Sequence, residues 1–382
     1  MSSKKQPATT EEVSELLREA TSKSQTVTPI GGRSKLDWGN PVEPDLRIDM
    51  LALSGVREHS WGDLTATVAA GTTWADMQAA LARDNQRVAL DPLFPARATV
   101  GGILATNDSG LLRLKYGSLR DLVLGMTIVL ADGTIARTGG KVVKNVAGYD
   151  LPKLLTGSFG TLGIITEATF RLHPIPAHTA TYTIRSADIA PLANLMSACL
   201  KASLSLEAMQ LRNEPDAFAL DLQLASLPEV LSEHEARLRA LTSLKVEPAD
   251  SCILRAREEI FKNPHTTIVK ITCLPTKLAA LVAGAAQLDH LPGHSAQCVA
   301  DPVGIVTLAL TGSPASLAKI VADLRARLVS TGGGVVVLRR GELPSDTDTW
   351  GPPPPAIDIM HAIKREFDPA HLLNPGKFIG GI

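Results

Sequence analysis

The chain has 382 residues, of which 45% are hydrophobic and 20% are charged, and its formal net charge is -1. These values predict a globular protein with two domains, and the lack of a basic excess excludes nucleic acid as a partner. No apolar run approaches the ~18 residues of a membrane-spanning helix, and the N-terminus lacks the apolar segment of a signal peptide. We therefore expect a cytoplasmic protein that reaches the inner membrane only through partners.

The sequence up to residue 173 predicts short helices and strands that are separated by turns. A helix is expected over residues 10–23, with Thr10 as its cap and an apolar stripe along one side. Strands are expected over residues 26–28, ending at Pro29, and over 46–50 and 64–70. A second helix is expected over residues 74–83, and glycine-rich turns with short apolar runs continue to residue 173.

After residue 176, strand and helix patterns alternate regularly. Strands are predicted near residues 181–185, 206–211, 217–224, 267–273, 303–310 and 334–338, and helices near 188–201, 228–241, 275–288 and 314–330. Two rounds of this pattern predict an antiparallel α+β domain of ferredoxin-like type. Pro352 to Pro355 form a stiff connector to a last helix over residues 356–367. We thus expect domains at 1–175 and 176–349, with a tail at 350–382 that returns to the first domain.

Four cysteines, at positions 199, 252, 273 and 298, stand far apart without a C-x-x-C pair. This spacing predicts buried, reduced thiols rather than an iron–sulfur or zinc site. The dinucleotide motif G-x-G-x-x-G is absent, and Gly140-Lys141 is followed by Val142, which does not complete a P-loop. A nicotinamide-binding Rossmann domain and a P-loop are therefore both disfavoured.

A first candidate site reads Pro-Ile-Gly-Gly-Arg-Ser-Lys from Pro29 to Lys35. Gly31 and Gly32 allow a sharp turn with exposed N–H groups, which can form a nest for an anion such as pyrophosphate. Ser34 adds a hydroxyl, and Arg33 and Lys35 add positive charge. An ordinary Gly-Gly turn with surface cations accounts for the same residues, so both interpretations stay open.

A second glycine pair, Gly101-Gly102, lies in a run of small and polar residues that includes Pro95, Thr99, Asn107 and Gly110. No bulky side chain in this pair would block a large planar ligand from the backbone, although tight helix packing explains the pair equally well. Tyr116 and Gly117 follow, before a strand that the sequence predicts to turn as a hairpin at Asp132-Gly133.

A further segment from Lys141 to Asp150 contains Lys144 and Asn145 and leads into three glycines spaced by three, namely Gly157, Gly160 and Gly163. Such glycines indicate close backbone approach or an unusual φ. The lysines have the alternative interpretation of solvated surface charges.

With Asn374-Pro375-Gly376-Lys377 near the C-terminus, these four segments resemble the vanillyl-alcohol-oxidase (PCMH-type) FAD family. The resemblance covers residues 26–175 and 350–382. It implies an α+β fold, in which a two-part PCMH-type FAD-binding domain carries an inserted ferredoxin-like cap. A donor such as Lys144 near the pyrimidine ring of a flavin would raise its potential, because the reduced flavin is anionic there.

The resemblance also implies which residues contact FAD. Residues 31–35 would hold the pyrophosphate, and Thr99, Gly101, Gly102, Asn107 and Gly110 would line the flavin. Ile165 would pack near the adenine, and Asn374 and Lys377 would close over the isoalloxazine. Pro29, Pro95, Tyr116, Gly117, Lys144, Gly160 and Gly163 complete the expected set of FAD contacts.

Three departures from the family pattern matter. Arg33 stands where some relatives attach FAD through a histidine, so we expect noncovalent FAD. Phe159 stands where many 2-hydroxy-acid dehydrogenases have an acidic residue, and their histidine-rich metal motif in the cap is missing, so no metal is expected. The nine histidines form no motif pair, which leaves the catalytic residues unassigned; His361 and His371, near the tail, are conceivable bases.

Within the family, the segment around Lys144 is most similar to FAD-binding subunits of glycolate oxidases. This implies an FAD-dependent oxidation of glycolate to glyoxylate, in a complex with a sister FAD subunit and an iron–sulfur subunit. Two alternatives stay open. The chain could be an electron relay or assembly subunit that does not itself catalyse, or a stand-alone flavin oxidase for another alcohol or 2-hydroxy acid.

Overall fold

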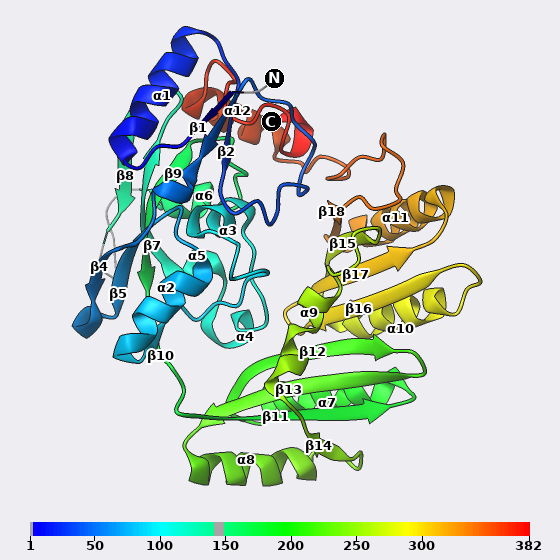
Figure 1. Ribbon diagram of the computed structural model, residues 1–382. Helices are drawn as coiled ribbons and strands as arrows, with labels where there is room; N and C mark the ends of the chain where they lie inside the picture. The colour runs from blue at the N-terminus through cyan, green and yellow to red at the C-terminus, as the bar shows by residue number, and fades with distance from the viewer. Residues whose placement is uncertain (1–2, 141–148) are drawn as a thin grey trace. The chain divides into compact units, whose positions relative to one another are not determined.

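The computed structural model describes residues 3–140 and 149–382. The chain divides into two compact units (Figure 1). The first unit comprises residues 1–110, 116–175 and 352–382, and the second comprises residues 111–115 and 176–351. The C-terminal segment thus belongs to the same unit as the N-terminal strands, and each unit is described separately below.

The first unit contains two main sheets. A three-stranded parallel sheet has the order β1-β3-β2, with β1 (Ser3–Lys5), β2 (Val27–Ile30) and β3 (Leu46–Asp49). A five-stranded antiparallel sheet has the order β4-β5-β9-β7-β8, with β4 (Val56–Ser60), β5 (Thr65–Ala69), β7 (Val123–Val129), β8 (Ile135–Gly139) and β9 (Ile164–Arg171). The predicted hairpin at Asp132-Gly133 is confirmed by the pairing of β7 with β8. β6 (Gln86–Arg87) pairs with β10 (His173–Pro174).

Helices cover these sheets: α1 (Thr10–Ser22), α2 (Trp74–Leu81), α3 (Val100–Thr106), α4 (Arg113–Tyr116), α5 (Leu119–Leu122), α6 (Leu151–Leu155) and α12 (Ile357–Phe367), with α4 shared between the units. The stripe of α1 that the sequence predicted is buried at Val13, Leu17 and Ala20. Its expected cap was wrong by one residue, because the Thr9 side chain accepts the Glu12 N–H at 3.1 Å.

Pro29 lies inside β2, whereas the sequence suggested that the strand ends there. Val27 turns its backbone toward the tail, since its N–H donates to the Leu372 carbonyl and its carbonyl accepts the Asn374 N–H. Residue 29, two positions further on, faces the same edge, so its missing N–H takes no hydrogen bond away from β3. The strand therefore continues to Ile30 and delivers the chain to Gly31.

The tail is fixed by a buried ion pair between Lys364 on α12 and Asp368, which we call the tail ion pair. The Lys364 Nζ donates to Asp368 Oδ2 at 2.6 Å, to the Thr161 carbonyl at 2.7 Å and to the Leu373 carbonyl at 2.9 Å. The Asp368 carboxylate accepts the backbone N–H groups of residues 372 and 373. This cluster holds the last residues of the chain against β2 and the 158–161 turn.

The second unit is built around an eight-stranded antiparallel sheet in the order β14-β11-β13-β12-β16-β17-β15-β18. Its strands are β11 (His178–Ser186), β12 (Leu206–Glu214), β13 (Ala217–Ser226), β14 (Val246–Pro248), β15 (Thr267–Thr272), β16 (Ser295–Asp301), β17 (Ile305–Thr311) and β18 (Gly334–Arg339). Its long helices are α7 (Ile189–Lys201), α8 (Pro228–Ala240), α10 (Leu278–Asp289) and α11 (Pro314–Val329). The short α9 (Ala256–Glu259) lies in the chain between β14 and β15.

These elements form two ferredoxin-like βαββαβ halves, which confirms the α+β fold class that the sequence predicted. In both halves the fourth strand pairs with the first, the first with the third and the third with the second. The halves meet where β12 pairs with β16, their corresponding second strands. β14 and β16 were not predicted. β14 is only three residues long, and the residues that β16 contributes to the apolar core are small, namely Ala296, Cys298 and Ala300.

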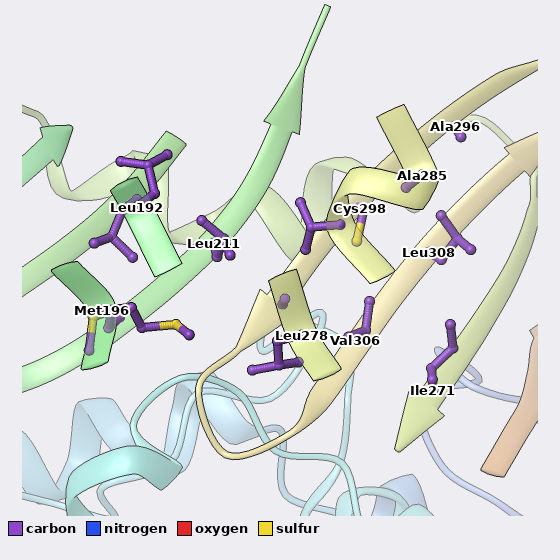
Figure 2. Packing of buried hydrophobic residues seen from close by; sticks show 14 of the residues in the cluster. Leu192, Met196, Leu211, Ile271, Leu278, Ala285, Ala296, Cys298, Val306 and Leu308 are labelled. Carbon is purple, nitrogen blue, oxygen red and sulfur yellow. The ribbon is translucent and has the colours of Figure 1, made fainter. Parts of the chain in front are cut away.

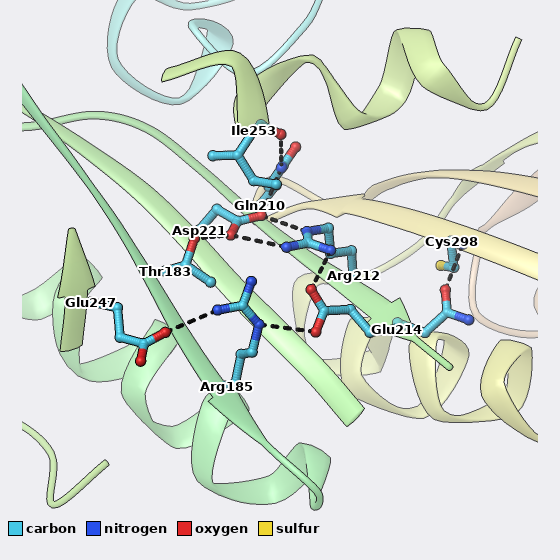
Figure 3. Close-up of polar contacts among 10 residues, drawn as sticks. Thr183, Arg185, Gln210, Arg212, Glu214, Asp221, Glu247, Ile253 and Cys298 are labelled. Carbon is cyan, nitrogen blue, oxygen red and sulfur yellow. Dashed lines mark hydrogen bonds and ion pairs between the residues drawn. The ribbon is translucent and has the colours of Figure 1, made fainter. Parts of the chain in front are cut away.

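One face of this sheet is apolar and is covered by the long helices. Leu192 and Met196 of α7 pack near Leu211 of β12, and Leu278 of α10 lies beside the sheet, as Figure 2 shows. The other face is polar at β11 to β13. There Asp221 is fully buried and accepts hydrogen bonds from Thr183, Gln210 and Arg212 (Figure 3). The alternation of the strands therefore separates an apolar core from a hydrogen-bonded polar layer.

Candidate functional site

A cavity of about 700 Å³ opens in the first unit, and a smaller one of about 60 Å³ adjoins it and shares part of its wall. The larger volume is typical of sites for cofactors and other small molecules. Its wall is formed by the end of β2, the loop of residues 31–35, one side of α3 (Gly102, Ala105 and Thr106), residues 159–160 and the tail. Segments from opposite ends of the sequence thus meet around one space.

Most of the residues singled out in the sequence lie on these walls. The larger cavity is lined by Pro29, Gly31, Gly32, Arg33, Ser34, Lys35, Thr99, Gly102, Gly160, Asn374 and Lys377. The smaller cavity adds Gly101, Gly163 and Ile165. Neither cavity is lined by Pro95, Asn107, Gly110, Tyr116 or Gly117. Lys144 lies outside the described residues.

The glycines of the wall serve two different purposes. A Cβ at Gly32 would stand 1.6 Å from the Arg97 carbonyl oxygen, and one at Gly31 would stand 2.2 Å from Thr99 Oγ1. These two positions must be glycine because the 31–35 loop packs directly against residues 97–99. At Gly102 a Cβ would meet only Thr99 Oγ1, at 3.2 Å, so a side chain there would extend into the open cavity.

The 31–35 loop carries the donors that an anion would need. Within the described chain, the backbone N–H groups of Gly31, Gly32, Arg33 and Ser34 donate to no protein acceptor. Arg33 has a φ of 56°, and left-handed residues are typical of loops whose successive N–H groups form an anion-binding nest. By contrast, the first N–H groups of α3 are already used, since Val100 donates to the Thr72 carbonyl and Gly101 to the Ala70 carbonyl.

The charged side chains of the loop are held by carboxylates. Lys35 is buried, with its Nζ 3.2 Å from Asp108 and 3.1 Å from the Leu93 carbonyl, so it anchors the loop to the segments before and after α3. Arg33 and Lys4 both reach Asp49, at 3.4 and 2.8 Å. Burial opposes ionisation of Asp49, but the Lys4 and Leu51 hydrogen bonds outweigh it and lower its pKa.

The tail completes the wall through Asn374 and Lys377. Asn374 accepts the Thr28 hydroxyl at 2.6 Å and donates to the Phe159 carbonyl at 2.7 Å, so it joins β2 to the 159–160 turn. The Lys377 ammonium is buried, and its Nζ donates to the Leu36 carbonyl at 2.9 Å. Burial lowers the pKa of Lys377 to about 8, against the opposing effect of Asp37.

Sequence reasoning did not single out an aromatic pair beside the cavity as a binding feature. Phe159 lines the cavity and stacks on Phe378, with ring centroids 5.6 Å apart. Its φ of 55° is unusual for a bulky residue and is held by backbone and Asn374 hydrogen bonds. No residue pattern in the sequence signals this conformation, because its cause is the non-local contact with the tail.

Tyr116 makes contacts of a different kind. Its ring lies 5.4 Å from the Arg87 guanidinium and 4.8 Å, centroid to centroid, from the His173 ring. Arg87 also donates to the Tyr116 hydroxyl at 3.1 Å. Because Arg87 and His173 are partners across the β6–β10 pair, Tyr116 packs on that small sheet rather than on the cavity.

The remaining predicted residues shape the segments behind the wall. Asn107 ends α3 with a φ of 49°, and Gly110 accommodates Asp91, whose carboxylate would be 2.3 Å from a Cβ at that position. Gly117 has a φ of 85° and lies against Asp121. Pro95 contributes its carbonyl to the start of α2, where it accepts the Ala75 N–H at 2.9 Å.

Known proteins share this architecture. A family model described as "FAD binding domain" matches residues 5–139, and one described as "FAD linked oxidases, C-terminal domain" matches residues 351–378. The chain is 28% identical to glycolate oxidase subunit GlcD of Bacillus subtilis, over 97% of this chain and 87% of that protein. It is 30% identical to an FAD-linked oxidoreductase of Mycobacterium tuberculosis, over 98% of this chain and 90% of that one.

Two further similarities differ in extent. Glycolate oxidase subunit GlcE of Escherichia coli is 37% identical over 147 residues, which is 38% of this chain and 42% of that protein. The solved structure of an alkyldihydroxyacetonephosphate synthase superposes with a TM-score of 0.75 at 18% identity, covering 98% of this chain and 77% of that one. At that identity, the likeness concerns the fold.

These findings define a flavoprotein oxidoreductase. The chain belongs to the PCMH-type family of FAD-linked oxidases, and FAD is its cofactor. The cavity suits that cofactor for two reasons. Its wall offers unused backbone donors at residues 31–34, and it has a glycine at position 102, where any larger residue would extend into the open space.

In residues 3–140 and 149–382, no helix is long and apolar enough to cross a membrane. Over the same part of the chain, no group of three or more His, Cys, Asp or Glu side chains is arranged to hold a metal ion.

Proposed function

We propose that the chain is an FAD-binding subunit of a glycolate-oxidising complex, in which glycolate is converted to glyoxylate. The observation that carries the proposal is similarity along 97% of the chain to a glycolate oxidase subunit, combined with partial similarity to a second subunit of such an enzyme. When bound, FAD accepts the hydride equivalent from the substrate carbon. The partners under this proposal are a sister FAD subunit and an iron–sulfur subunit.

Within this function, we assign FAD to the cavity of the first unit. The N–H groups of residues 31–34 would bind the diphosphate, and the hollow beside Gly163 and Ile165 would take the adenine. Asn374 would position the 159–160 turn against the cofactor through its bond to the Phe159 carbonyl. The loop, α3 and the tail would together exclude water from the diphosphate.

A second candidate is an electron-relay or assembly subunit whose sister subunit performs the oxidation. Three histidines of the second unit favour it, because each is engaged with a different partner. His234 Nδ1 accepts the Ser205 N–H, His294 Nε2 lies 2.6 Å from Ser316 Oγ, and His265 lies 3.4 Å from Glu342. Oxidation of a 2-hydroxy acid needs a base for the hydroxyl proton. These contacts hold the three histidines apart from one another and do not bring them together as a catalytic group.

The behaviour of the purified chain alone tests the second candidate. Glycolate is added anaerobically to the FAD-loaded chain, and the visible absorbance of the flavin is followed. We expect slow or no bleaching of the isolated chain, and bleaching once the partner subunits are present. Rapid and complete bleaching of the lone chain would eliminate the relay. Bleaching by another alcohol or 2-hydroxy acid, but not by glycolate with or without partners, would overturn the glycolate assignment.

A further inference from the structure

A serine and a histidine form a close pair in the second unit, where the chain passes from β17 to α11. Ser316 lies in the first turn of α11, and His294 directly precedes β16. The last pair of the β16–β17 ladder is Ser295 with Thr311, so His294 and Gly312 stand one step beyond the end of the ladder. His294 Nε2 and Ser316 Oγ are 2.6 Å apart, and both side chains are half-buried.

The imidazole of His294 is held with a lone pair toward the serine. Its Nδ1 lies 3.1 Å from the Pro292 carbonyl oxygen, which can only accept a hydrogen bond. Nδ1 therefore carries the proton of the neutral ring, and Nε2 accepts from the Ser316 hydroxyl. A Cβ at Gly312 would stand 2.7 Å from His294 Cδ2, so a larger residue there would push the ring out of this position. A hydroxyl that donates to an oriented imidazole is the arrangement that activates a serine as a nucleophile.

The start of α11 can stabilise negative charge. Ser313 caps the helix, because its side chain accepts the Ser316 N–H and its carbonyl accepts the Leu317 N–H at 2.9 Å. In the part of the chain that the structure describes, the Ala315 N–H donates to no protein acceptor. α11 has 16 residues, and the positive end of its dipole lies at this turn. An oxyanion at this helix start therefore has an unused donor and a favourable field available to it.

We propose that Ser316 is an activated nucleophile that takes an acyl group from a small ester or thioester. The Ser316 oxygen attacks the acyl carbon, and its proton passes to His294 Nε2. The bond from the acyl carbon to the leaving oxygen or sulfur then breaks, and His294 gives the proton to that leaving group. The products are an ester of Ser316 and a free alcohol or thiol. Nothing is oxidised or reduced, so the flavin has no part in this step.

The surroundings of the pair indicate which acyl groups fit. Apart from Pro314, residues 312 to 315 have small side chains or none, so we expect a short acyl group such as acetyl. Neither His294 nor Ser316 lines the two cavities of the first unit. The inference therefore does not rest on the proposed oxidation of glycolate, and either one can hold if the other fails.

The test uses the complete, FAD-loaded protein with p-nitrophenyl acetate as the acyl donor. Release of p-nitrophenolate is followed, and the acetylated residues are located by peptide mass spectrometry. We expect a fast phase of release that matches acetylation of Ser316, and Ser316→Ala should lose this phase. General-base catalysis contributes roughly 10²–10⁴-fold, so His294→Gln should be acetylated at Ser316 at least about 100-fold more slowly. Gly312→Ala should also slow this acetylation, although both reactive side chains remain.

Ser232 provides the matched control. It is an exposed serine on the long helix α8, and its hydroxyl donates to the Pro228 carbonyl at 3.1 Å instead of to a histidine. Ser232→Ala should therefore release p-nitrophenolate as the natural protein does. Thermal unfolding and the flavin-to-protein absorbance ratio show whether each variant is folded, and the Gly312→Ala and His294→Gln proteins keep the serine if Ser316→Ala does not fold.

Two results would overturn the proposal. Acetylation of Ser316 no faster than that of Ser232 in the natural protein would show that the serine is not activated. Equal rates at Ser316 in the natural protein and in folded His294→Gln would show that the hydrogen bond only ties the segment before β16 to α11.

Discussion

The tail ion pair offers a sharp test of how the C-terminal segment builds the cavity wall. Lys364→Met keeps most of the apolar stem but removes the ammonium, which donates three hydrogen bonds to buried acceptors. The Asp368 carboxylate then stays fully buried, with only backbone N–H groups to stabilise its charge. Asn374 and Lys377 lie directly beyond this cluster, so both would lose their support.

The expected cost follows from burial. Removing one partner of a buried ion pair costs about 3–5 kcal/mol, because an uncompensated charge is left in the interior. In a unit of this size, 1 kcal/mol corresponds to about 2–4 °C in Tm, so the melting temperature of the first unit should fall by about 10 °C. FAD affinity should fall with it. The double variant Lys364→Met/Asp368→Leu should recover part of the loss, since no charge remains buried.

The assay is thermal unfolding followed by circular dichroism, with FAD release as a second signal. Lys23→Met is the matched control, because Lys23 and Glu19 form an i,i+4 pair of similar length, 2.5 Å, on the exposed surface of α1. Its loss should cost less than about 0.5 kcal/mol. A Lys364→Met protein as stable as the Lys23→Met protein would refute the view that this pair holds the tail in place.

Two further predictions concern the cofactor. Gly32→Ala should lower both stability and the flavin-to-protein absorbance ratio, because its Cβ would collide with the Arg97 carbonyl, whereas Gly102→Ala should lower FAD affinity with little change in Tm. The reverse pattern would show that the wall is misassigned. Because Arg33 stands at the position of a tethering histidine, acid precipitation should release all yellow colour into the supernatant, and colour retained in the pellet would indicate a covalent link.

Much of the second unit could be predicted because its strands alternate between an apolar and a polar face and its helices carry apolar stripes. The strand β16 could not, because the residues that it contributes to the apolar core, Ala296, Cys298 and Ala300, are small and give a weak signal. One of its two neighbouring strands, β12, also lies in the other half of the unit. The joining of two ferredoxin-like halves into one sheet could not be predicted either, because it depends on the order of the strands, and no local sequence pattern determines that order.

The candidate site was predictable where glycine was the signal. Glycine is needed at positions 31 and 32 because residues 97–99 approach them closely, and at position 102 because a side chain there would enter the cavity. In the sequence, both requirements appear as glycine pairs. The roles of charged and aromatic side chains were harder to predict. Lys35 was considered as a ligand for an anion, but its partner Asp108 lies far along the chain, and Tyr116 packs on residues of two distant strands.

The most direct test of the account is an experimental structure of the protein loaded with FAD. We predict that the diphosphate lies within hydrogen-bonding distance of the backbone N–H groups of residues 31–34, with the adenine beside Ile165. FAD bound outside the first-unit cavity, or a diphosphate that makes no contact with the 31–35 loop, would contradict the assignment of this cavity as the cofactor site.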